Sequence, residues 1–145
     1  MKVKIKRLNE RAKLPAYGTE YSAGADLYAL SDTDIEIAPH TTTLISTGIS
    51  VEIPEGYCGL IFARSGLATK RGLAPANKVG VIDADYRGEV KVALHNHTDS
   101  VATVGAYERV AQLAIVPFLK AEFEECEELS DTARGEGGFG STGKN

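Results

Sequence analysis

Short alternating runs of β-branched and aromatic residues are the feature that most restricts the fold of this chain. Such runs cover residues 35–37, 42–53, 57–62, 89–95 and 108–118, with Gly, Pro, Asp or Asn residues between them. Many short strands with turn signals about every 8–12 residues are typical of an all-β barrel or sandwich. A doubly wound α/β fold is excluded, because no amphipathic helices of about 10–15 residues alternate with the strands.

Three further segments complete the predicted elements. Residues 63–72 form the best helix candidate, about two turns long, and a helix is expected to open near Ser65. Val3 and Ile5 alternate with lysines, which predicts a half-buried N-terminal strand. Residues 121–129 alternate as well, and we expect a last strand there with a charged outer face.

The size and composition of the chain indicate a single globular domain. With 145 residues, 43% hydrophobic and 25% charged, it can bury a sizeable core. We expect residues 1–130 to form this domain and residues 131–145, which are rich in glycine, to form a flexible flap.

Cysteine usage and hydropathy favour a cytoplasmic protein that does not enter the membrane. Cys58 and Cys126 lack the spacing of a metal site, and no run approaches the roughly 18 apolar residues of a membrane span. The first residues also lack the apolar block of a signal peptide.

The net charge of −4 is unevenly distributed. Residues 121–131 carry six acidic side chains and no basic one, so the remaining residues sum to +2. An acidic total argues against nucleic acid as a partner. It does not exclude a small polyanionic ligand, because a few placed arginines decide that.

The stretch from Asn77 to Gly88 combines strand-forming residues with polar groups. Residues 79–82 are apolar, Asp83 and Asp85 interrupt the run, and Tyr86 follows before alternation resumes at residue 89. This pattern predicts a β-hairpin that carries carboxylates and an aromatic ring near its bend. An ordinary charged turn has the same pattern, and periodicity does not choose between the two carboxylates.

Two other segments have groups suited to an anion. Arg64 and Ser65 combine a guanidinium, a hydroxyl and free backbone N–H groups at the predicted helix start. Residues 131–145 combine Arg134, an aromatic ring, two hydroxyls and many unhindered N–H groups, which suit a flap that closes on a nucleotide. His95 and His97 have a spacing that metals use, but with no carboxylate or thiol assigned beside them we interpret them as polar surface residues.

The order of these segments resembles the homotrimeric dUTP pyrophosphatase (dUTPase) family. Five stretches are similar to the five family motifs, in order: residues 22–27 (SAGADL), 64–68 (RSGLA), 80–88 (GVIDADYRG), 108–112 (ERVAQ) and 134–143 (RGEGGFGSTG). Three positions depart from the common pattern: Ala63 replaces Pro, Ala84 replaces Ser, and Tyr107 replaces the Gly that often precedes the fourth motif. None of these departures removes a reacting group.

The resemblance implies a distorted jelly-roll β-barrel with one short helix. It implies a homotrimer whose active sites each combine residues of three chains. It also implies Mg²⁺-assisted hydrolysis of dUTP to dUMP and diphosphate, by in-line attack of water on the α-phosphorus. This reaction keeps uracil out of DNA and supplies dUMP for thymidylate synthesis.

The resemblance also assigns roles to residues. Asp83 would activate the attacking water, Tyr86 would pack on the deoxyribose, Phe139 would cover the base, and Asp26 would act on the metal through water. No direct protein ligand of the metal is expected. The substrate-binding residues would be Arg64, Ser65, Gly66, Asn77, Gly80, Val81, Ile82, Tyr86, Gln112, Arg134, Phe139, Gly140, Ser141 and Thr142.

Two alternatives stay open at this point. The dCTP deaminases share the fold and part of the motif set, but are expected to lack the flap of residues 134–143 in this form. A non-catalytic dUTPase-like nucleotide sensor or protein-binding module requires a broken site, whereas Asp83, Tyr86, Arg134 and Phe139 are all present.

Overall fold

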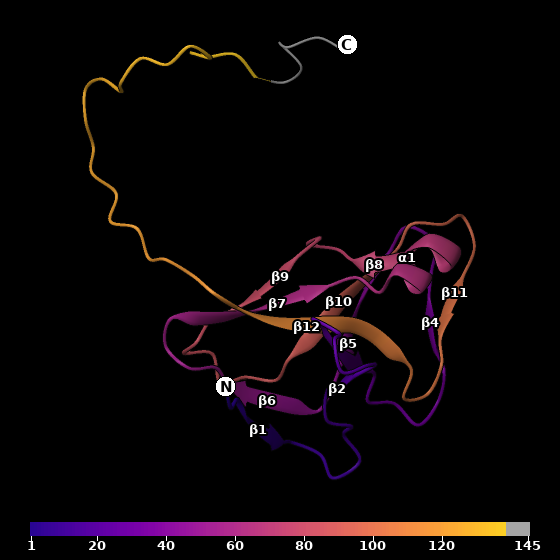
Figure 1. Ribbon diagram of the computed structural model, residues 1–145. Helices are drawn as coiled ribbons and strands as arrows, with labels where there is room; N and C mark the ends of the chain where they lie inside the picture. Colours follow the sequence, from indigo (N-terminus) through magenta and orange to yellow (C-terminus); the bar gives the residue numbers. More distant parts are fainter. Residues whose placement is uncertain (139–145) are drawn as a thin grey trace.

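The computed structural model describes residues 1–138, which form an antiparallel β-barrel with one short helix (Figure 1). Its strands are β1 (Lys4–Arg7), β2 (Ala16–Tyr17), β3 (Ala25–Tyr28), β4 (Ile35–Ile37), β5 (Thr42–Ser46), β6 (Ile49–Glu52), β7 (Tyr57–Phe62), β8 (Leu73–Pro75), β9 (Gly80–Ile82), β10 (Lys91–Asn96), β11 (Ala102–Val104) and β12 (Arg109–Pro117). The helix α1 covers Ser65–Arg71. The expected all-β fold with one short helix is confirmed.

The strands form four small sheets whose pairs are all antiparallel. The largest has the order β2-β3-β12-β7-β9, and β12, the longest strand, lies at its centre. The others are β5-β10-β8, β1-β6 and β11-β4. Few neighbours in these sheets are consecutive in sequence, so most of the fold depends on long-range pairing.

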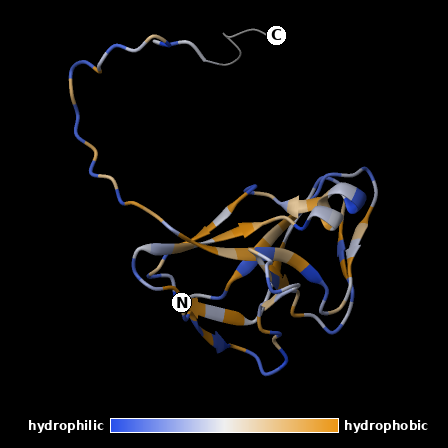
Figure 2. Ribbon diagram, viewed as in Figure 1, coloured by the Kyte–Doolittle hydropathy of each residue, from blue (hydrophilic) through white to orange (hydrophobic). Residues whose placement is uncertain are grey.

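The core lies between the sheets and consists almost entirely of aliphatic side chains. On β10, Val92, Leu94 and Asn96 point inward and are buried, while alternate residues point outward. The orange stretches of Figure 2 mark the apolar strands around this core. Each fully buried Val, Leu or Ile contributes about 1.5–3 kcal/mol relative to an exposed one. The largest fully buried aliphatic side chains are Leu27, Ile37, Ile45, Ile49, Leu73, Val90, Val92, Leu94, Val104 and Val110.

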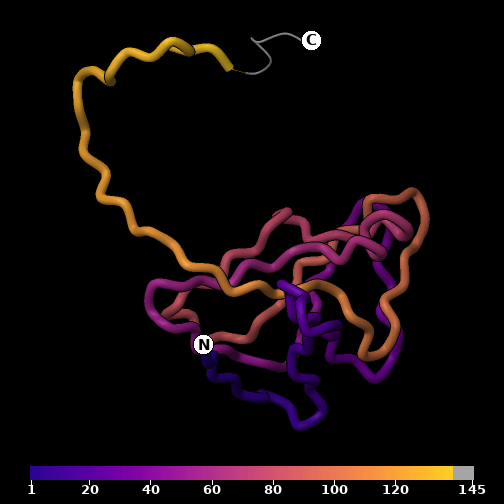
Figure 3. The backbone as a smooth tube through the Cα atoms, viewed as in Figure 1, coloured from indigo at the N-terminus to yellow at the C-terminus, as the bar shows by residue number. Residues whose placement is uncertain are grey.

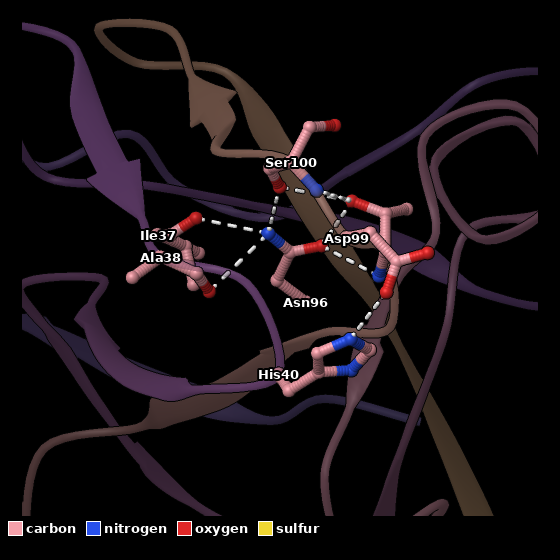
Figure 4. A network of polar contacts seen from close by, with 7 residues as sticks. Ile37, Ala38, His40, Asn96, Asp99 and Ser100 are labelled. Carbon is pink, nitrogen blue, oxygen red and sulfur yellow. Dashed lines mark hydrogen bonds and ion pairs between the residues drawn. The ribbon is translucent and has the colours of Figure 1, made fainter.

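Asn96 is a buried polar residue that joins two loops of the barrel (Figure 4). Its side-chain amide donates to the carbonyl oxygens of Ile37, Ala38 and Ser100, and its oxygen accepts from the backbone N–H and hydroxyl of Thr98. Because all of these polar groups are paired, the buried amide fixes the loops without a desolvation penalty.

Helix α1 is short because Gly72 caps its C-terminal end. Gly72 adopts a left-handed conformation (φ 62°) and its N–H bonds to the carbonyl of Leu67. Lys70 and Arg71 lie in the last turn, where positive charge is favourable.

The predicted hairpin of residues 77–92 is wrong in its pairing. Strand β9 pairs with β7, through Gly80 with Ile61 and Ile82 with Gly59, whereas β10 pairs with β5 and β8. Residues 83–90 are therefore a connection between two sheets and not the tip of a hairpin. Burial of β10 in the second sheet outweighs the local preference for a hairpin.

Two predictions about the ends of the chain also need correction. Strand β1 forms, but all four of its residues are exposed, and Ile5 keeps 37% of its surface accessible. No strand forms at residues 121–129, and residues 118–138 contain no helix or strand. Figure 3 shows this segment leaving the barrel as an extended arm, and within residues 1–138 no strand pairs with it.

None of the helices within residues 1–138 has the length and apolar character needed to cross a membrane.

Candidate active site

Two pockets on the barrel collect nearly all of the predicted site residues that the structure describes. The first has a volume of about 350 Å³ and the second about 400 Å³. The first is lined by Leu44, Ile61, Asn77, Gly80, Val81, Ile82, Asp83, Tyr86, Glu89, Val90 and Lys91. The second is lined by Gly18, Ser22, Ala23, Gly24, Asp26, Arg64, Ser65, Gly66, Arg109 and Gln112. We call the first the hairpin-side pocket, because it lies on the segment of residues 77–92 for which a hairpin was predicted. We call the second the arginine pocket.

Strand β9 forms one wall of the hairpin-side pocket and is an edge strand. It pairs with β7 on one side, and in residues 1–138 no strand pairs with its other side. The outer edge therefore offers backbone N–H and C=O groups to a ligand. Asn77 lies beside this edge, since a Cβ built on Gly80 would be 3.3 Å from the Asn77 amide nitrogen.

The ring of Tyr86 is fixed by the turn that follows β9. Its N–H bonds to the carbonyl of Asp83 at 3.1 Å, and its hydroxyl donates to the carbonyl of Glu89 at 2.9 Å. Arg87 donates to the carbonyls of Ala84 and Tyr86, at 2.6 and 3.0 Å, and so closes the same turn. The turn presents the aromatic ring at the pocket wall in one orientation.

The two carboxylates of this turn face different pockets. Asp83 lines the hairpin-side pocket, whereas Asp85 lines a separate depression together with Glu52, Pro54 and Arg87. The separation follows from the turn itself, because the Tyr86 N–H to Asp83 carbonyl bond reverses the chain between them. Sequence periodicity left this choice open.

Asp26 is the centre of the arginine pocket. Its two carboxylate oxygens accept hydrogen bonds from Arg64 Nε at 2.8 Å and from Arg109 Nη1 at 3.1 Å. Strand β3 supplies the carboxylate, the residue before α1 supplies one guanidinium, and β12 supplies the other. With two guanidiniums and one carboxylate, the pocket lining has a net positive charge, which suits an anion.

Gln112 is held between two backbone segments of the same pocket. Its Nε2 donates to the carbonyl of Ala63 at 2.9 Å, and a Cβ on Gly24 would be 2.7 Å from its Oε1. Glycine at position 24 therefore allows the amide to lie against the loop that precedes β3. The side chain links that loop to the residues that open α1.

Comparison with known proteins identifies the family of this chain. The family model described as dUTPase matches residues 10–143. A deoxyuridine 5'-triphosphate nucleotidohydrolase of Nautilia profundicola is 51% identical over 144 residues, which cover 99% of this chain and 100% of that protein. The chain belongs to the dUTPase family.

Solved dUTPase structures agree with the fold. The dUTPase of Staphylococcus bacteriophage 80alpha, solved with dUPNHPP, superposes with a TM-score of 0.89 at 30% identity and covers 98% of both chains. A mutant dUTPase of phage phi11 of S. aureus, described with a structural Mg(II) ion, has a TM-score of 0.77 at 26% identity, covering 88% of this chain and 98% of that one.

Arg109 lines the arginine pocket, and the sequence analysis did not name it among the candidate site residues. Its side chain donates a hydrogen bond to Asp26. It belongs to the fourth motif, in which Gln112 was the only residue assigned to substrate binding. Strand periodicity does not predict that Arg109 shares a pocket with Gln112, because residues 109 and 112 point to opposite faces of a regular strand. The motif itself was the only available signal.

Tyr107 shows why this dUTPase departs from glycine before the fourth motif. Its φ of 54° lies in the left-handed region, where a side chain is strained. Its hydroxyl donates to Asp32 at 2.5 Å, and Lys13 lies 5.3 Å from its ring centroid. These contacts offset the strain and keep the turn.

The described residues contain no cluster of three or more His, Cys, Asp or Glu side chains that fits a metal ion. His95 and His97 lie edge to face, with ring centroids 4.5 Å apart, and His95 Nδ1 is 2.9 Å from the hydroxyl of Thr42. In the arginine pocket, Asp26 is the single carboxylate. This donor set fits Mg²⁺ held mainly by phosphate oxygens and water.

The predicted residues of the fifth motif fall in two groups. Arg134 lies on the arm, where its Nε donates to the carbonyl of Gly137 at 2.7 Å, and it lines neither pocket of this chain. Phe139, Gly140, Ser141 and Thr142 lie outside the described residues.

Proposed function

We propose that this dUTPase hydrolyses dUTP to dUMP and diphosphate by attack of a water, held by Asp83, on the α-phosphorus. The observation that carries the proposal is the composition of the hairpin-side pocket. A free strand edge, the ring of Tyr86 and the carboxylate of Asp83 lie together there, which are the groups that a base, a sugar and an attacking water require. The other carboxylate of the lining, Glu89, is already paired with the Gly48 N–H and with Lys91.

The free edge of β9 explains selection of uracil. Uracil presents two carbonyl acceptors on either side of an N–H donor, and the backbone of residues 80–82 with the amide of Asn77 can match this pattern. Cytosine reverses two of these positions, and each polar group left unpaired costs about 1–3 kcal/mol. The pocket therefore discriminates by hydrogen bonding and not by size.

Tyr86 explains selection of a deoxyribose. With its hydroxyl fixed to the Glu89 carbonyl, the ring cannot turn away from a sugar bound in the pocket. A ring packed on the sugar leaves no room for a 2′-hydroxyl, so UTP is excluded.

Asp83 accepts the proton of the attacking water as the general base. Its carboxylate is exposed at the pocket wall, and no hydrogen bond from another described residue occupies it. General-base assistance of this kind typically contributes about 10²–10⁴ in rate. The rest of the barrier is lowered by positioning and by neutralising charge on the phosphate chain.

The phosphate chain is bound by the arginine pocket and by the flap. Arg64, Ser65, Gly66 and Gln112 contribute from the barrel, and Arg134, Gly140, Ser141 and Thr142 from the flap, while Phe139 covers the base. Mg²⁺ bound to the phosphates supplies further neutralisation of their charge. Asp26 would contact the water shell of this ion, because a carboxylate whose two oxygens each accept one N–H keeps acceptor capacity for water.

We further propose a homotrimer in which different chains complete one active site. None of residues 1–138 lines both pockets, so the base site and the phosphate site on this part of the chain are separate surfaces. The arm of residues 118–138 carries Leu119 and Phe123 with 98% and 96% of their surface exposed. An apolar groove of about 300 Å³, lined by Val3, Ile5, Leu113 and Ile115 among others, is available to such side chains in a second copy.

The experiment that tests the activity measures diphosphate release from dUTP, dCTP, dTTP and UTP, with Mg²⁺ and with EDTA. We expect release from dUTP alone and its loss in EDTA. Formation of dUTP from dCTP would instead identify a deaminase, and binding of dUTP without turnover would identify a nucleotide sensor.

A further inference from the structure

We propose that Arg109 is a phosphate-binding residue and that Asp26 is the positioning residue that aims Arg109 and Arg64 together into the arginine pocket. The inference rests on the proposed function, and it deepens that function by assigning a second guanidinium to the barrel side of the phosphate site. It gives Asp26 a role that does not depend on metal.

Strand β12 is irregular where it pairs with β3. The register with β3 shifts between Arg109 and Ala111, so that Val110 is an extra residue in the ladder. Gln112 is opposite Asp26, Ala111 is opposite Leu27, and Arg109 takes the place opposite Tyr28. A bulge of this kind re-aims the side chain beside it.

The burial pattern shows which way the side chains are turned. Val110 and Ala111 are both fully buried, although adjacent residues of a regular strand face opposite sides. Arg109 and Gln112 consequently emerge on one face and line the same pocket. Without the bulge, the Arg109 side chain would lie on the face opposite to Gln112.

Asp26 is largely buried and pairs with both arginines. Only 14% of its side chain is exposed, compared with 26% for Arg64 and 50% for Arg109. A carboxylate so far buried requires paired donors, and both of its oxygens have them. Two guanidiniums on one carboxylate are thereby brought to the same wall of the pocket.

Both guanidiniums keep N–H donors that can bind a ligand. Each arginine has five N–H donors, and within residues 1–138 each has one hydrogen bond, in both cases to Asp26. Both arginines line the pocket together with Ser65 and Gln112. A planar fork of donors fixed by a carboxylate is the arrangement that binds phosphate oxygens in pairs.

The test measures binding of the non-hydrolysable analogue dUPNHPP to the full-length protein in EDTA. We expect Arg109→Gln to weaken binding about tenfold to a hundredfold, as loss of a charge-assisted hydrogen bond does. Arg109→Lys, which keeps the charge but not the fork, should recover part of the loss. Asp26→Asn should weaken binding about tenfold without metal, because both guanidiniums lose their fixed partner.

Two controls separate positioning from general damage to the fold. Arg11→Gln removes an arginine that also pairs with one aspartate, Asp32, but lies outside both pockets, and it should leave binding unchanged. Competition by deoxyuridine, which has no phosphate, should be the same in all variants. Weakening of deoxyuridine binding in parallel with dUPNHPP would overturn the proposal by assigning Arg109 a purely structural role.

Two other results would also overturn it. Unchanged dUPNHPP binding by Arg109→Gln would remove Arg109 from the phosphate site, and an Asp26→Asn defect confined to Mg²⁺-containing buffer would assign Asp26 to the metal alone. In either case the wild type would still release diphosphate from dUTP. Failure of the proposed function would instead show as a wild type that does not hydrolyse dUTP.

Discussion

The ring of Tyr86 lies directly against Gly88. A Cβ built on Gly88 would be 2.5 Å from Cζ of that ring, a distance that real contacts do not reach. Since the Tyr86 hydroxyl is bonded to the Glu89 carbonyl across the same turn, the ring has no space to retreat without losing that bond.

We therefore expect Gly88→Ala to displace Tyr86 and relax the discrimination between dUTP and UTP. Overpacking of about 1–3 kcal/mol corresponds to a loss of roughly fivefold to 150-fold in kcat/KM for dUTP. The ratio of kcat/KM for dUTP and UTP is the measurement. Gly105→Ala is the control, because its Cβ would meet no atom closer than 3.6 Å. A Gly88→Ala enzyme with unaltered selectivity would show that the ring does not set it.

Asp83→Asn should greatly slow the chemical step. The amide keeps the size and much of the hydrogen bonding of the carboxylate but cannot accept the proton of water. We expect kcat to fall at least about a hundredfold, while affinity for dUPNHPP changes only a few-fold. Single-turnover kinetics and calorimetry measure the two quantities.

Asp85→Asn is the matched control for that variant, since Asp85 is two residues away but lines a different depression. Its chemical step should be affected much less. If the Asp85 variant lost activity and the Asp83 variant kept it, the assignment of the general base would be wrong, although the substrate assignment would survive.

Removal of residues 134–145 should leave the barrel folded and reduce activity severely. The last strand ends at Pro117, so the truncation removes no part of a sheet that the structure describes. Circular dichroism and diphosphate release report the two properties. In addition, Phe139→Trp places a lone tryptophan in a chain that has none. Its emission should change on binding dUPNHPP, and a constant spectrum at saturation would argue against stacking.

Sedimentation equilibrium should give three times the chain mass of 15.4 kDa. Phe123→Asp should weaken this assembly, because a charge replaces an exposed aromatic side chain on the arm that we expect to enter an apolar groove of a second copy. Val101→Asp, at another exposed apolar position, is the control. A fully active monomer would contradict sites shared between chains.

Tyr107→Phe should lower the unfolding temperature at pH 7. The Tyr107 hydrogen bond, followed by Arg11, lowers the pKa of Asp32 from its ordinary value of 3.8, and the same bond raises the pKa of Tyr107 above 10.0. A lowered carboxyl pKa gives stability above pH 3.8 that is lost as the pH falls, and a raised tyrosine pKa gives stability that is lost above pH 10.

The difference between wild type and Tyr107→Phe should accordingly be full near neutral pH and shrink below pH 3.8. Thermal unfolding followed by circular dichroism over this range measures it. Tyr21→Phe, at a fully solvated tyrosine, is the reference substitution. A difference that stayed constant into the acid range would assign the effect to the ring and not to the hydrogen bond.

Local pattern was sufficient for the helix, for most of the strands and for the family of this protein. Alternation located eight of the twelve strands of residues 1–138 but not β2, β3, β8 and β11, the predicted helix segment of residues 63–72 contains α1, and the order of five motifs indicated the family. These features depend on neighbours in sequence, such as turn residues, the period of side chains and the groups within one loop, so a single chain reveals them.

Long-range pairing was decided only in three dimensions. Strand β9 pairs with β7 instead of β10, and the segment of residues 121–129 finds no partner in its own chain, because many strands of similar pattern compete and burial selects among them. The same holds for Arg109. The side chain that reaches Asp26 depends on one extra residue in the ladder with β3, and that irregularity exists only once the two strands have met.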